Sequence, residues 1–183
     1  FRVYARGLTG KIEGLIYKDW SISAMPDVYK KRWIGLDFGF TNDPTAILDV
    51  RLSDGQLWVD EIAYSTGLLN SDIASILEPY KDFDIIADSA EPKSIAELRG
   101  YRLKVEGAAK GADSIKNEND ILKRYHINIT STSSNLKREL MSYKWADNRN
   151  GGLLNKPIDE YNHALDALRY VALNKLNSKP KAR

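Results

Sequence analysis

Apolar runs in the first third of the chain predict three consecutive strands. The run at 33–39 is apolar up to Asp37, and two further runs rich in β-branched side chains follow at 45–52 and 56–64. The Ser-Asp-Gly sequence at 53–55 has the composition of a tight hairpin turn between the second and third runs. The pattern therefore predicts three antiparallel strands.

Beyond residue 70 the pattern changes to alternating helices and strands. Residues 71–80 carry apolar side chains at helical spacing, and a compact apolar run at 83–87 ends at Asp88. The remaining elements are predicted in the order helix, strand, helix, strand and helix, at 92–99, 101–106, 113–125, 127–130 and 134–145. Because alternating helices and strands favour parallel pairing, we expect an α/β fold with a mixed sheet and helices on both faces.

The last part of the chain predicts a tight loop at 148–152 and a long helix at 159–176. Pro157 introduces this helix, and Asp159 is expected to cap it. Its apolar stripe consists of Tyr161, Leu165, Leu168, Ala172 and Leu176. A stripe on one side of a helix is typical of a helix packed against a core.

Length and composition set the expected domain organisation. With 183 residues and 43% hydrophobic content, the chain can bury one sizeable core. We expect 33–176 to form that domain, 1–32 to be an irregular segment and 177–183 to be a disordered basic tail. The chain begins at Phe1 with neither an initiator Met nor a signal-peptide pattern, which suggests a fragment of a longer chain.

Composition excludes several kinds of site. The chain has no cysteine, so disulfides and thiolate zinc sites are not available, and no apolar run is long enough to span a bilayer. The net charge of +2 hides an asymmetry, since 1–92 carry 9 basic and 15 acidic residues and 93–183 carry 18 and 10. Acids around a metal beside a basic face would suit a phosphodiester substrate, but ordinary surface charge explains the same numbers.

Asp37 and Asp88 each end a strongly apolar predicted strand. A charge is costly to bury there without compensating partners, and sites in such sheets form at the carboxyl ends of strands. The two carboxylates could therefore meet in one crevice. The alternative is structural, because an Asp close to a Gly, as Asp37 is to Gly39, commonly forms a turn.

Asp166 is more informative because of its place on the last helix. At 3.6 residues per turn, it lies roughly 100° from the centre of the apolar stripe, at the boundary between core and solvent. It can therefore face the sheet edge. His163 lies three residues earlier on the same side, so the two could share a site. A histidine at such a boundary is also commonly a surface residue.

Three carboxylates suit hard divalent cations. Mg²⁺ and Mn²⁺ take oxygen ligands, and two ions about 4 Å apart can activate water and stabilise the leaving 3′ oxygen in phosphodiester hydrolysis. With no cysteine and only His126 and His163 available, a zinc enzyme is disfavoured. No Ser-His-Asp or phosphate-loop spacing is apparent.

Three segments together resemble the nuclease domain of bacteriophage terminase large subunits. They are Ile-Gly-Leu-Asp-Phe-Gly at 34–39, Ile-Ile-Ala-Asp-Ser-Ala-Glu-Pro at 85–92 and Asn-His-Ala-Leu-Asp-Ala-Leu-Arg-Tyr at 162–170. The third segment is the most specific, together with Tyr-Lys-Trp at 143–145, Gly151, Gly152 and Pro157. The resemblance covers about 33–174 and implies an RNase H-like fold that follows an N-terminal packaging ATPase.

The resemblance implies roles for particular residues. The metal-binding acids of the family match Asp37, Asp88 and Asp166. His163 matches a residue beside the third acid, and Asp43 and Glu91 match possible accessory acids. The implied cofactors are Mg²⁺ or Mn²⁺, as two ions. The implied activity is an endonuclease that cuts concatemeric double-stranded viral DNA during genome packaging, with little sequence specificity.

The resemblance also implies partners and a location. Double-stranded DNA is the substrate, the portal protein and the small terminase subunit are partners, and an ATPase domain lies upstream in the full chain. The implied location is the host cell cytoplasm, transiently at the procapsid portal.

Basic residues give candidates for DNA contact. Two stretches contain them, with Arg102, Lys104 and Lys110 in the first and Lys137, Lys144, Arg149 and Lys156 in the second. A hairpin occupies the second place in the resembling enzymes and affects access to the active site. Lys110, Lys144 and Arg149 are the candidates that we retain. Ordinary solvated side chains are the alternative, and backbone contacts would give weak sequence preference with strong salt dependence.

Three other functions stay open at this level. Residues 37–42 also resemble the first phosphate loop of actin and heat-shock-chaperone ATPases, although the second loop and the adenosine-binding Gly pair of those proteins do not appear. Other RNase H-like nucleases, such as resolvases, transposases and hybrid nucleases, share the carboxylates and the fold. A domain that only binds DNA or another protein would use the acids structurally.

Overall fold

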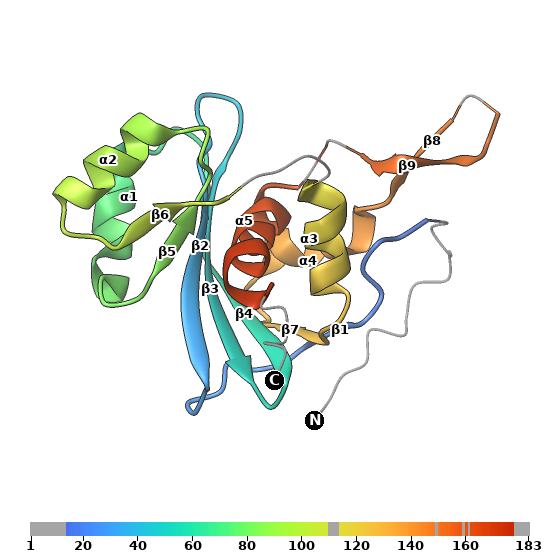
Figure 1. Ribbon diagram of the computed structural model, residues 1–183, viewed down its shortest axis with the longest axis horizontal. Coiled ribbons are helices and arrows are strands. Elements are labelled where there is room, and N and C mark those ends of the chain that lie inside the picture. Colours follow the sequence, from blue (N-terminus) through green and yellow to red (C-terminus); the bar gives the residue numbers. More distant parts are fainter. Residues whose placement is uncertain (1–13, 110–113, 149, 159, 161, 178–183) are drawn as a thin grey trace, which may run out of the picture.

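A seven-stranded mixed sheet is the centre of the computed structural model (Figure 1), which describes residues 14–109, 114–148, 150–158, 160 and 162–177. Its strands are β1 (Trp20–Ile22), β2 (Lys31–Asp37), β3 (Thr45–Ser53), β4 (Gln56–Ser65), β5 (Ile85–Ala87), β6 (Val105–Gly107) and β7 (Ile127–Ile129). Their order across the sheet is β1-β7-β4-β3-β2-β5-β6. The expected α/β fold with a mixed sheet is confirmed.

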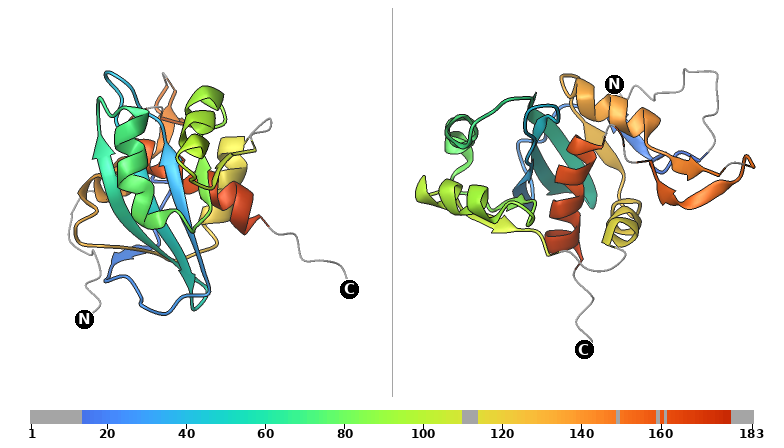
Figure 2. Two further views of the ribbon diagram at one scale, coloured as in Figure 1. Left: turned by 90° about the vertical axis from the view of Figure 1, so that its left-hand side faces the viewer. Right: turned by 90° about the horizontal axis from the view of Figure 1, so that it is seen from above.

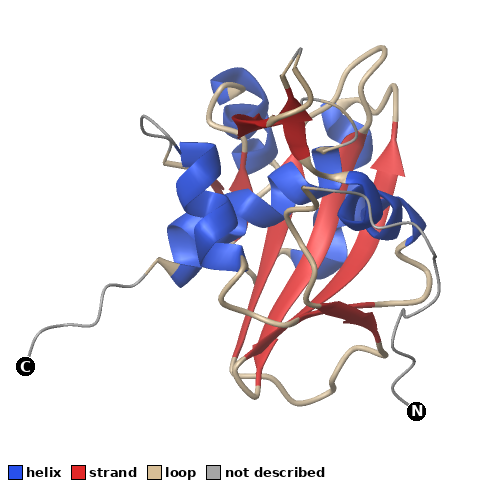
Figure 3. Ribbon diagram, turned by 90° about the vertical axis from the view of Figure 1, so that its right-hand side faces the viewer, coloured by secondary structure: helices blue, strands red, loops and turns tan. Residues whose placement is uncertain are grey.

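The long strands β2, β3 and β4 form the antiparallel group that the apolar runs predict (Figure 3). Asp54 and Gly55 connect β3 to β4 with φ angles of 50° and 70°. This left-handed backbone is why an Asp-Gly pair suits the turn. Strands β5 and β7 pair in parallel with β2 and β4, respectively. The carboxyl ends of β2, β4, β5 and β7 therefore lie at one edge of the sheet.

Helices cover both faces of the sheet, each face over its own apolar core (Figure 1). One face carries α1 (Asn70–Leu77), the 3₁₀ turn η1 (Glu78–Tyr80) and α2 (Pro92–Gly100). The other face carries α3 (Ser114–Leu122), α4 (Ser134–Ser142), α5 (His163–Val171) and the π turn η2 (Ala172–Leu176). Helix α5 lies between the sheet and α3 (Figure 2). Among the described helices, none is long and apolar enough to cross a membrane.

The predicted start of the last helix was wrong. The helix begins at His163, after Asn162 as its N-terminal cap, and not at 159. The chain just before it is held extended as β9 (Leu153–Pro157), so helical structure can begin only after the chain has returned to the sheet. Asp159 and Tyr161 lie outside the described residues, as do 178–183 of the expected tail. The rest of the predicted stripe is buried, as expected.

Other boundaries also differ from the prediction, two of them for a clear physical reason. The helix expected over 134–145 ends at Ser142, because Trp145 enters strand β8 (Trp145–Asp147) and pairs with β9. The strand expected over 101–106 starts only at Val105, because the N–H groups of Tyr101 and Arg102 still bond the carbonyls of the last helical turn. In the first place the pairing of β8 with β9 ends the helix early, and in the second the hydrogen bonds of the last helical turn delay the strand.

Strands β8 and β9 form a separate hairpin that projects away from the main sheet (Figure 1). The described residues of the predicted tight loop at 148–152 form its turn. The side-chain Oδ1 of Asn148 accepts the N–H groups of Asn150 and Gly152 at 2.9 and 2.8 Å and so closes this turn. Leu153 and Leu154 on β9 are 48% and 44% exposed.

The segment before β2 is more ordered than the sequence predicts. Residues 1–13 lie outside the described residues, but β1 joins the sheet beside β7 through the bonds Ile127 N–H to Asp19 O (3.1 Å) and Ser23 N–H to Ile129 O (2.9 Å). A three-residue strand is too short to show a period of its own. Ile16 and Tyr17 are also buried in the core, so the structured part begins well before residue 33.

A close contact between β2 and α5 fixes the position of the last helix. A Cβ atom placed on Gly35 would lie 2.4 Å from the carbonyl oxygen of Ala167 and 3.2 Å from Val171 Cγ2. Only a glycine on β2 therefore allows the helix backbone to approach this near. The N-terminal end of α5, which carries His163 and Asp166, is positioned by this contact.

We expect Gly35→Ala to lower the free energy of unfolding by about 1–3 kcal/mol, because the added methyl group must push the α5 backbone away from the sheet. Urea denaturation measures the loss. Gly100→Ala is the matched control, since a Cβ atom placed on Gly100 meets no heavy atom within 4 Å. Equal stability of the two variants would show that α5 does not depend on this approach.

Candidate active site

A cleft of about 750 Å³ opens at the edge of the sheet where β2 and β5 end and α5 begins. It is lined by Asp37, Phe38, Asn42, Asp43, Pro44, Tyr64, Asp88, Arg138, Glu160, Asn162, His163, Asp166 and Tyr170. The three predicted metal ligands, Asp37, Asp88 and Asp166, line it together. The fold thus brings together carboxylates that lie far apart in the sequence.

Asp37 is the last residue of β2 and is only 6% exposed. The hydroxyl of Tyr170 donates to its Oδ1 at 3.2 Å, and Nδ1 of His163 lies 3.2 Å from its Oδ2. Burial raises the pKa of the Asp37 carboxyl, the bond to His163 opposes this rise, and the charge of Asp88 adds to it. The buried carboxylate of Asp37 therefore has two hydrogen-bonding partners, His163 and Tyr170.

Asp88 lies beside Asp37 because of the register of the sheet. Leu36 of β2 is paired with Ala87 of β5 in parallel, so the next residue of each strand is an aspartate. The Oδ1 atom of Asp88 accepts the N–H of Ala90 at 2.9 Å. The charge of Asp88 contributes to the raised pKa values of both Asp37 and Tyr170, which places the three groups in one electrostatic field.

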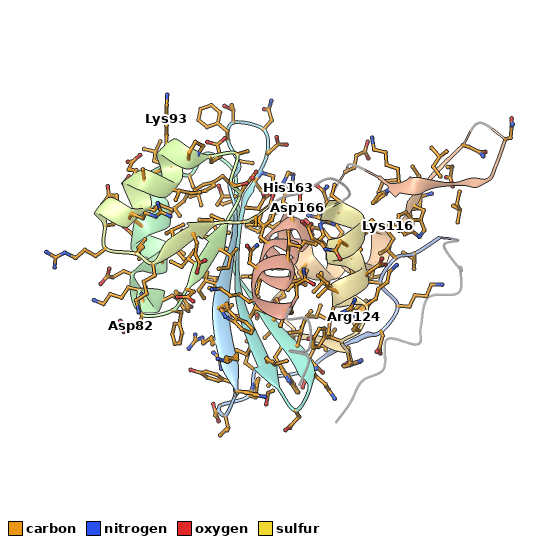
Figure 4. The ribbon with its side chains drawn as sticks, viewed as in Figure 1. Asp82, Lys93, Lys116, Arg124, His163 and Asp166 are labelled. Atoms are coloured by element: carbon orange, nitrogen blue, oxygen red, sulfur yellow. The ribbon has the colours of Figure 1, made fainter. Side chains whose placement is uncertain are left out.

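Asp166 and His163 come from the first turn of α5 and lie together at its upper end, next to the sheet (Figure 4). Asp166 is 23% exposed and forms a close ion pair with the buried guanidinium of Arg169. Nε2 of His163 lies 3.8 Å from Oδ1 of Asp43. The bond to Asp37 raises the pKa of His163.

The structure adds cleft residues that no sequence pattern selected. Tyr64, Arg138, Glu160, Asn162 and Tyr170 line the cleft. Tyr64 and Arg138 lie far in sequence from the motif segments, so no local spacing could have identified them. Only Tyr170 and Asn162 lie within a motif segment, at its two ends. Arg138 is an exposed cation at the cleft, which is the charge that a phosphate would need there.

Glu139 is a buried carboxylate that sequence reasoning also missed. It is fully buried on α4, and its two oxygens accept the N–H groups of Ala164 (3.2 Å) and Leu165 (2.8 Å) at the start of α5. Tyr64 donates its hydroxyl to the same carboxylate at 2.8 Å. Burial raises the pKa of Glu139, and these bonds oppose the rise. Glu139 therefore anchors the helix end that carries His163 and Asp166.

Other predicted residues lie elsewhere or outside the described residues. Asp43 lines the cleft, whereas Glu91 is the exposed residue before α2 and is not among the lining residues. Lys144 precedes β8 and bonds Oδ2 of Asp147 at 3.0 Å. Lys110 and Arg149 lie outside the described residues.

The donor set of the cleft fits a hard divalent cation. All three predicted ligands offer carboxylate oxygens, and the charge of Asp88 raises the pKa of Asp37, a repulsion that a cation would relieve. Over the part of the chain that the structure describes, no three His, Asp or Glu side chains are already gathered to hold an ion. Asp166, for example, directs one oxygen to Arg169.

A second polar cluster has the order of a Ser-His-Asp arrangement, which no spacing in the sequence revealed. Ser21 Oγ lies 2.8 Å from His126 Nε2, and His126 Nδ1 lies 2.6 Å from Asp19 Oδ1. Ser21 is only 7% exposed and also bonds Asn128 at 3.2 Å. His126 precedes β7 at the sheet edge opposite the cleft. These side chains fasten β1 to β7.

Comparison with known proteins gives a family match for this chain. The family described as "Terminase RNAseH like domain" matches residues 37–174. The large terminase subunit of Bacillus phage SPP1 is 30% identical over 146 residues, which cover 75% of this chain and 34% of that protein. The chain thus spans about a third of the length of this relative. The actin-like and chaperone-like alternative is not supported.

Solved structures show the same fold. The nuclease domain of the large terminase g2p from bacteriophage SPP1, crystallised with bound Mn, is 28% identical with a TM-score of 0.75, over 84% of this chain and 95% of that one. The large terminase of a thermophilic bacteriophage, in complex with ADP, is 24% identical with a TM-score of 0.74, over 90% of this chain and 46% of that one.

A more distant structure has the same fold. The large terminase nuclease of the thermophilic phage G20c with bound magnesium is 15% identical with a TM-score of 0.53, over 82% of this chain and 84% of that one. From the family match over 37–174 and the shared architecture, we conclude that this chain belongs to the terminase RNase H-like domain family.

Proposed function

We propose that this chain is a metal-dependent endonuclease that cuts concatemeric double-stranded viral DNA during genome packaging, with little sequence specificity. The observation that carries the proposal is the convergence of Asp37, Asp88 and Asp166 on one cleft in a member of the terminase RNase H-like family. The metal ions in the SPP1 and G20c nuclease structures support it.

The three carboxylates would hold Mg²⁺ or Mn²⁺, as two ions. When bound, such ions polarise the phosphate and lower the pKa of an attacking water. The protein's own part is to orient the acids. Tyr170 and His163 each hold one oxygen of Asp37, and the backbone of Ala90 holds Asp88. These bonds limit side-chain rotation before any cation arrives.

His163 is placed to carry a proton in the cleft. Its Nδ1 faces Asp37 and its Nε2 faces the exposed Asp43, so one ring nitrogen is fixed while the other is turned toward solvent. The same bond to Asp37 favours the protonated imidazole. His163 can therefore hold a proton close to a developing charge on the leaving oxygen.

DNA would approach along the basic side of the cleft and the hairpin. Arg138 lines the cleft, and Lys144 lies at the base of the β8–β9 hairpin. We propose that these two residues, together with Lys110 and Arg149, contact the phosphate backbone. Such contacts carry no base information, which agrees with cutting that is nearly independent of sequence.

The full protein would be longer than the sequence described. The chain covers 34% of the SPP1 large subunit and 46% of the large terminase solved with ADP. We propose that this chain follows an N-terminal packaging ATPase domain, and that the segment before β2, which supplies β1 and the buried Ile16 and Tyr17, belongs to the nuclease domain. The portal protein and the small terminase subunit would be its partners, in the host cytoplasm and at the procapsid portal.

We expect the purified chain with Mn²⁺ to convert supercoiled plasmid to nicked and linear DNA. Asp37→Ala, Asp88→Ala and Asp166→Ala should each lower the rate by at least about a hundredfold, because each removes a ligand for a charge-stabilising ion. Asp82→Asn is the control, since exposed Asp82 precedes β5 at the opposite sheet edge, far from His163 and Asp166 (Figure 4).

Retained cutting in Asp88→Ala would overturn the ligand assignment. An RNA–DNA hybrid serves as a second substrate in the same assay, and preference for the hybrid would favour another RNase H-like nuclease over a terminase.

The ion pair between His163 and Asp37 should make stability depend on pH. The pKa of His163 is raised above 6.5 in the folded protein, so the contribution of the pair is fully present below pH 6.5 and is lost as the pH rises through the folded value. Without metal, His163→Gln should cost roughly 0.5–1 kcal/mol at about pH 6 and little at about pH 9. Urea denaturation at both pH values measures it, and a pH-independent loss would contradict the pair.

Arg138→Ala and Lys144→Ala should each reduce the salt dependence of DNA binding. Each phosphate contact contributes about 0.9 to the slope of log K against log salt concentration, so each variant should lose about that much. Fluorescence anisotropy with a DNA duplex, in calcium to prevent cutting, measures the slope. Lys81→Ala is the control, because Lys81 is bonded to Glu78 ahead of β5, at the opposite sheet edge. Unchanged slopes in both variants would remove these residues from the interface.

A further inference from the structure

Arg169 is a buried cation directly behind the cleft. It lies on α5, three residues after Asp166, and is 1% exposed. It is absent from the residues that line the cleft, so it cannot touch a substrate bound there. A buried guanidinium is tolerated only when charged and polar partners surround it.

The partners of Arg169 come from three elements. Its Nη1 donates to the hydroxyl of Tyr143 at 2.8 Å, and its guanidinium carbon lies 5.1 Å from the centre of the Tyr143 ring. Its Nε lies 3.6 Å from Oε2 of Glu118, which is 2% exposed. Its Nη2 contacts Oδ1 of Asp166. Of these partners, only Asp166 lines the cleft.

Tyr143 is itself held by the segment before β1. The N–H of Ile16 bonds the carbonyl of Tyr143 at 3.1 Å, and the N–H of Trp145 bonds the carbonyl of Gly14 at 3.0 Å. The ring of Tyr17 stacks on the ring of Tyr143, with 6.1 Å between centroids. We call residues 14–17 the N-terminal strap. A continuous set of contacts therefore runs from this strap through Tyr143 and Arg169 to the third acid.

The geometry points to Arg169 as the positioning residue of Asp166, with Tyr143 and the N-terminal strap holding Arg169 in that role. The inference rests on the proposed function, in which Asp166 is a metal ligand. The guanidinium contacts Oδ1 of Asp166, whose side chain lines the cleft. Arginine stays charged at all accessible pH values, and its planar guanidinium hydrogen-bonds Tyr143 while it pairs electrostatically with Glu118 and Asp166.

A lysine at this position would keep the charge but not the geometry. A single ammonium group on a flexible stem cannot reach all three partners with the spacing of a planar guanidinium. We expect Arg169→Lys to weaken Mn²⁺ binding about tenfold, which is the usual effect of losing a residue that orients a metal ligand. Tyr143→Phe should weaken it in the same direction, because it removes only the hydroxyl that fixes Arg169.

Isothermal titration of Mn²⁺ into the metal-free chain tests this, with thermal unfolding recorded for every variant. Arg32→Lys is the matched control. Arg32 donates two bonds to buried Asp49 at 2.9 and 3.0 Å, at the start of β2 and away from the cleft. It is also an arginine that pairs with an aspartate, so it reports the general cost of replacing a paired Arg by Lys. We expect Arg32→Lys to lower stability but to leave Mn²⁺ affinity unchanged.

The outcomes separate this inference from the proposed function. Weaker Mn²⁺ binding in Arg169→Lys and Tyr143→Phe, with wild-type affinity in Arg32→Lys, supports the positioning role. Wild-type affinity in Tyr143→Phe and in folded Arg169→Lys overturns it while the proposed function stands. An equal loss of affinity in Arg32→Lys overturns it too, because the effect would then follow stability. If the wild-type chain binds no Mn²⁺, the proposed function and this inference both fail.

Discussion

The close approach of α5 to β2 is the contact on which the cleft depends. The helix backbone packs against β2 at Gly35, which has no side chain. A Cβ atom at this position would clash with the carbonyl oxygen of Ala167 on α5. This approach sets the positions of His163 and Asp166 relative to Asp37. A packed core transmits small displacements rather than absorbing them. The geometry of the site therefore depends on the position of this one helix.

Charge compensation is the second constraint, because the same region buries several ionisable groups. Glu139 is compensated by backbone donors at the start of α5, Asp37 by His163 and Tyr170, and Arg169 by partners on three elements. Removing one member of such a pair is costly, because the other member would remain buried without a partner. The acids of the cleft are thus held by a polar layer that reaches into the core. Solved nuclease domains of the same fold contain bound Mn or magnesium.

The apolar runs predicted β2, β3 and β4 well, since long strands in a hairpin-connected group carry a strong local signal. The apolar pattern did not predict strand β1 or the start of the last helix. Strand β1 has three residues and exists because β7 offers it a parallel neighbour. The start of the last helix moved to His163 because the hairpin before it keeps the chain extended. The first case is decided by a partner distant in sequence and the second by the pairing of β9 with β8, and the local apolar pattern contains neither.

The sequence by itself determined the α/β class and the central strands and selected the three acids as candidates, because strand periodicity and a charge at the end of an apolar run are local properties. Only the tertiary structure decided which side chains meet. Register places Asp88 beside Asp37, Glu139 reaches the beginning of the last helix, and Arg169 joins the third acid to the strap at 14–17. These contacts depend on how far apart elements pack in space, and that distance is fixed by the whole core at once.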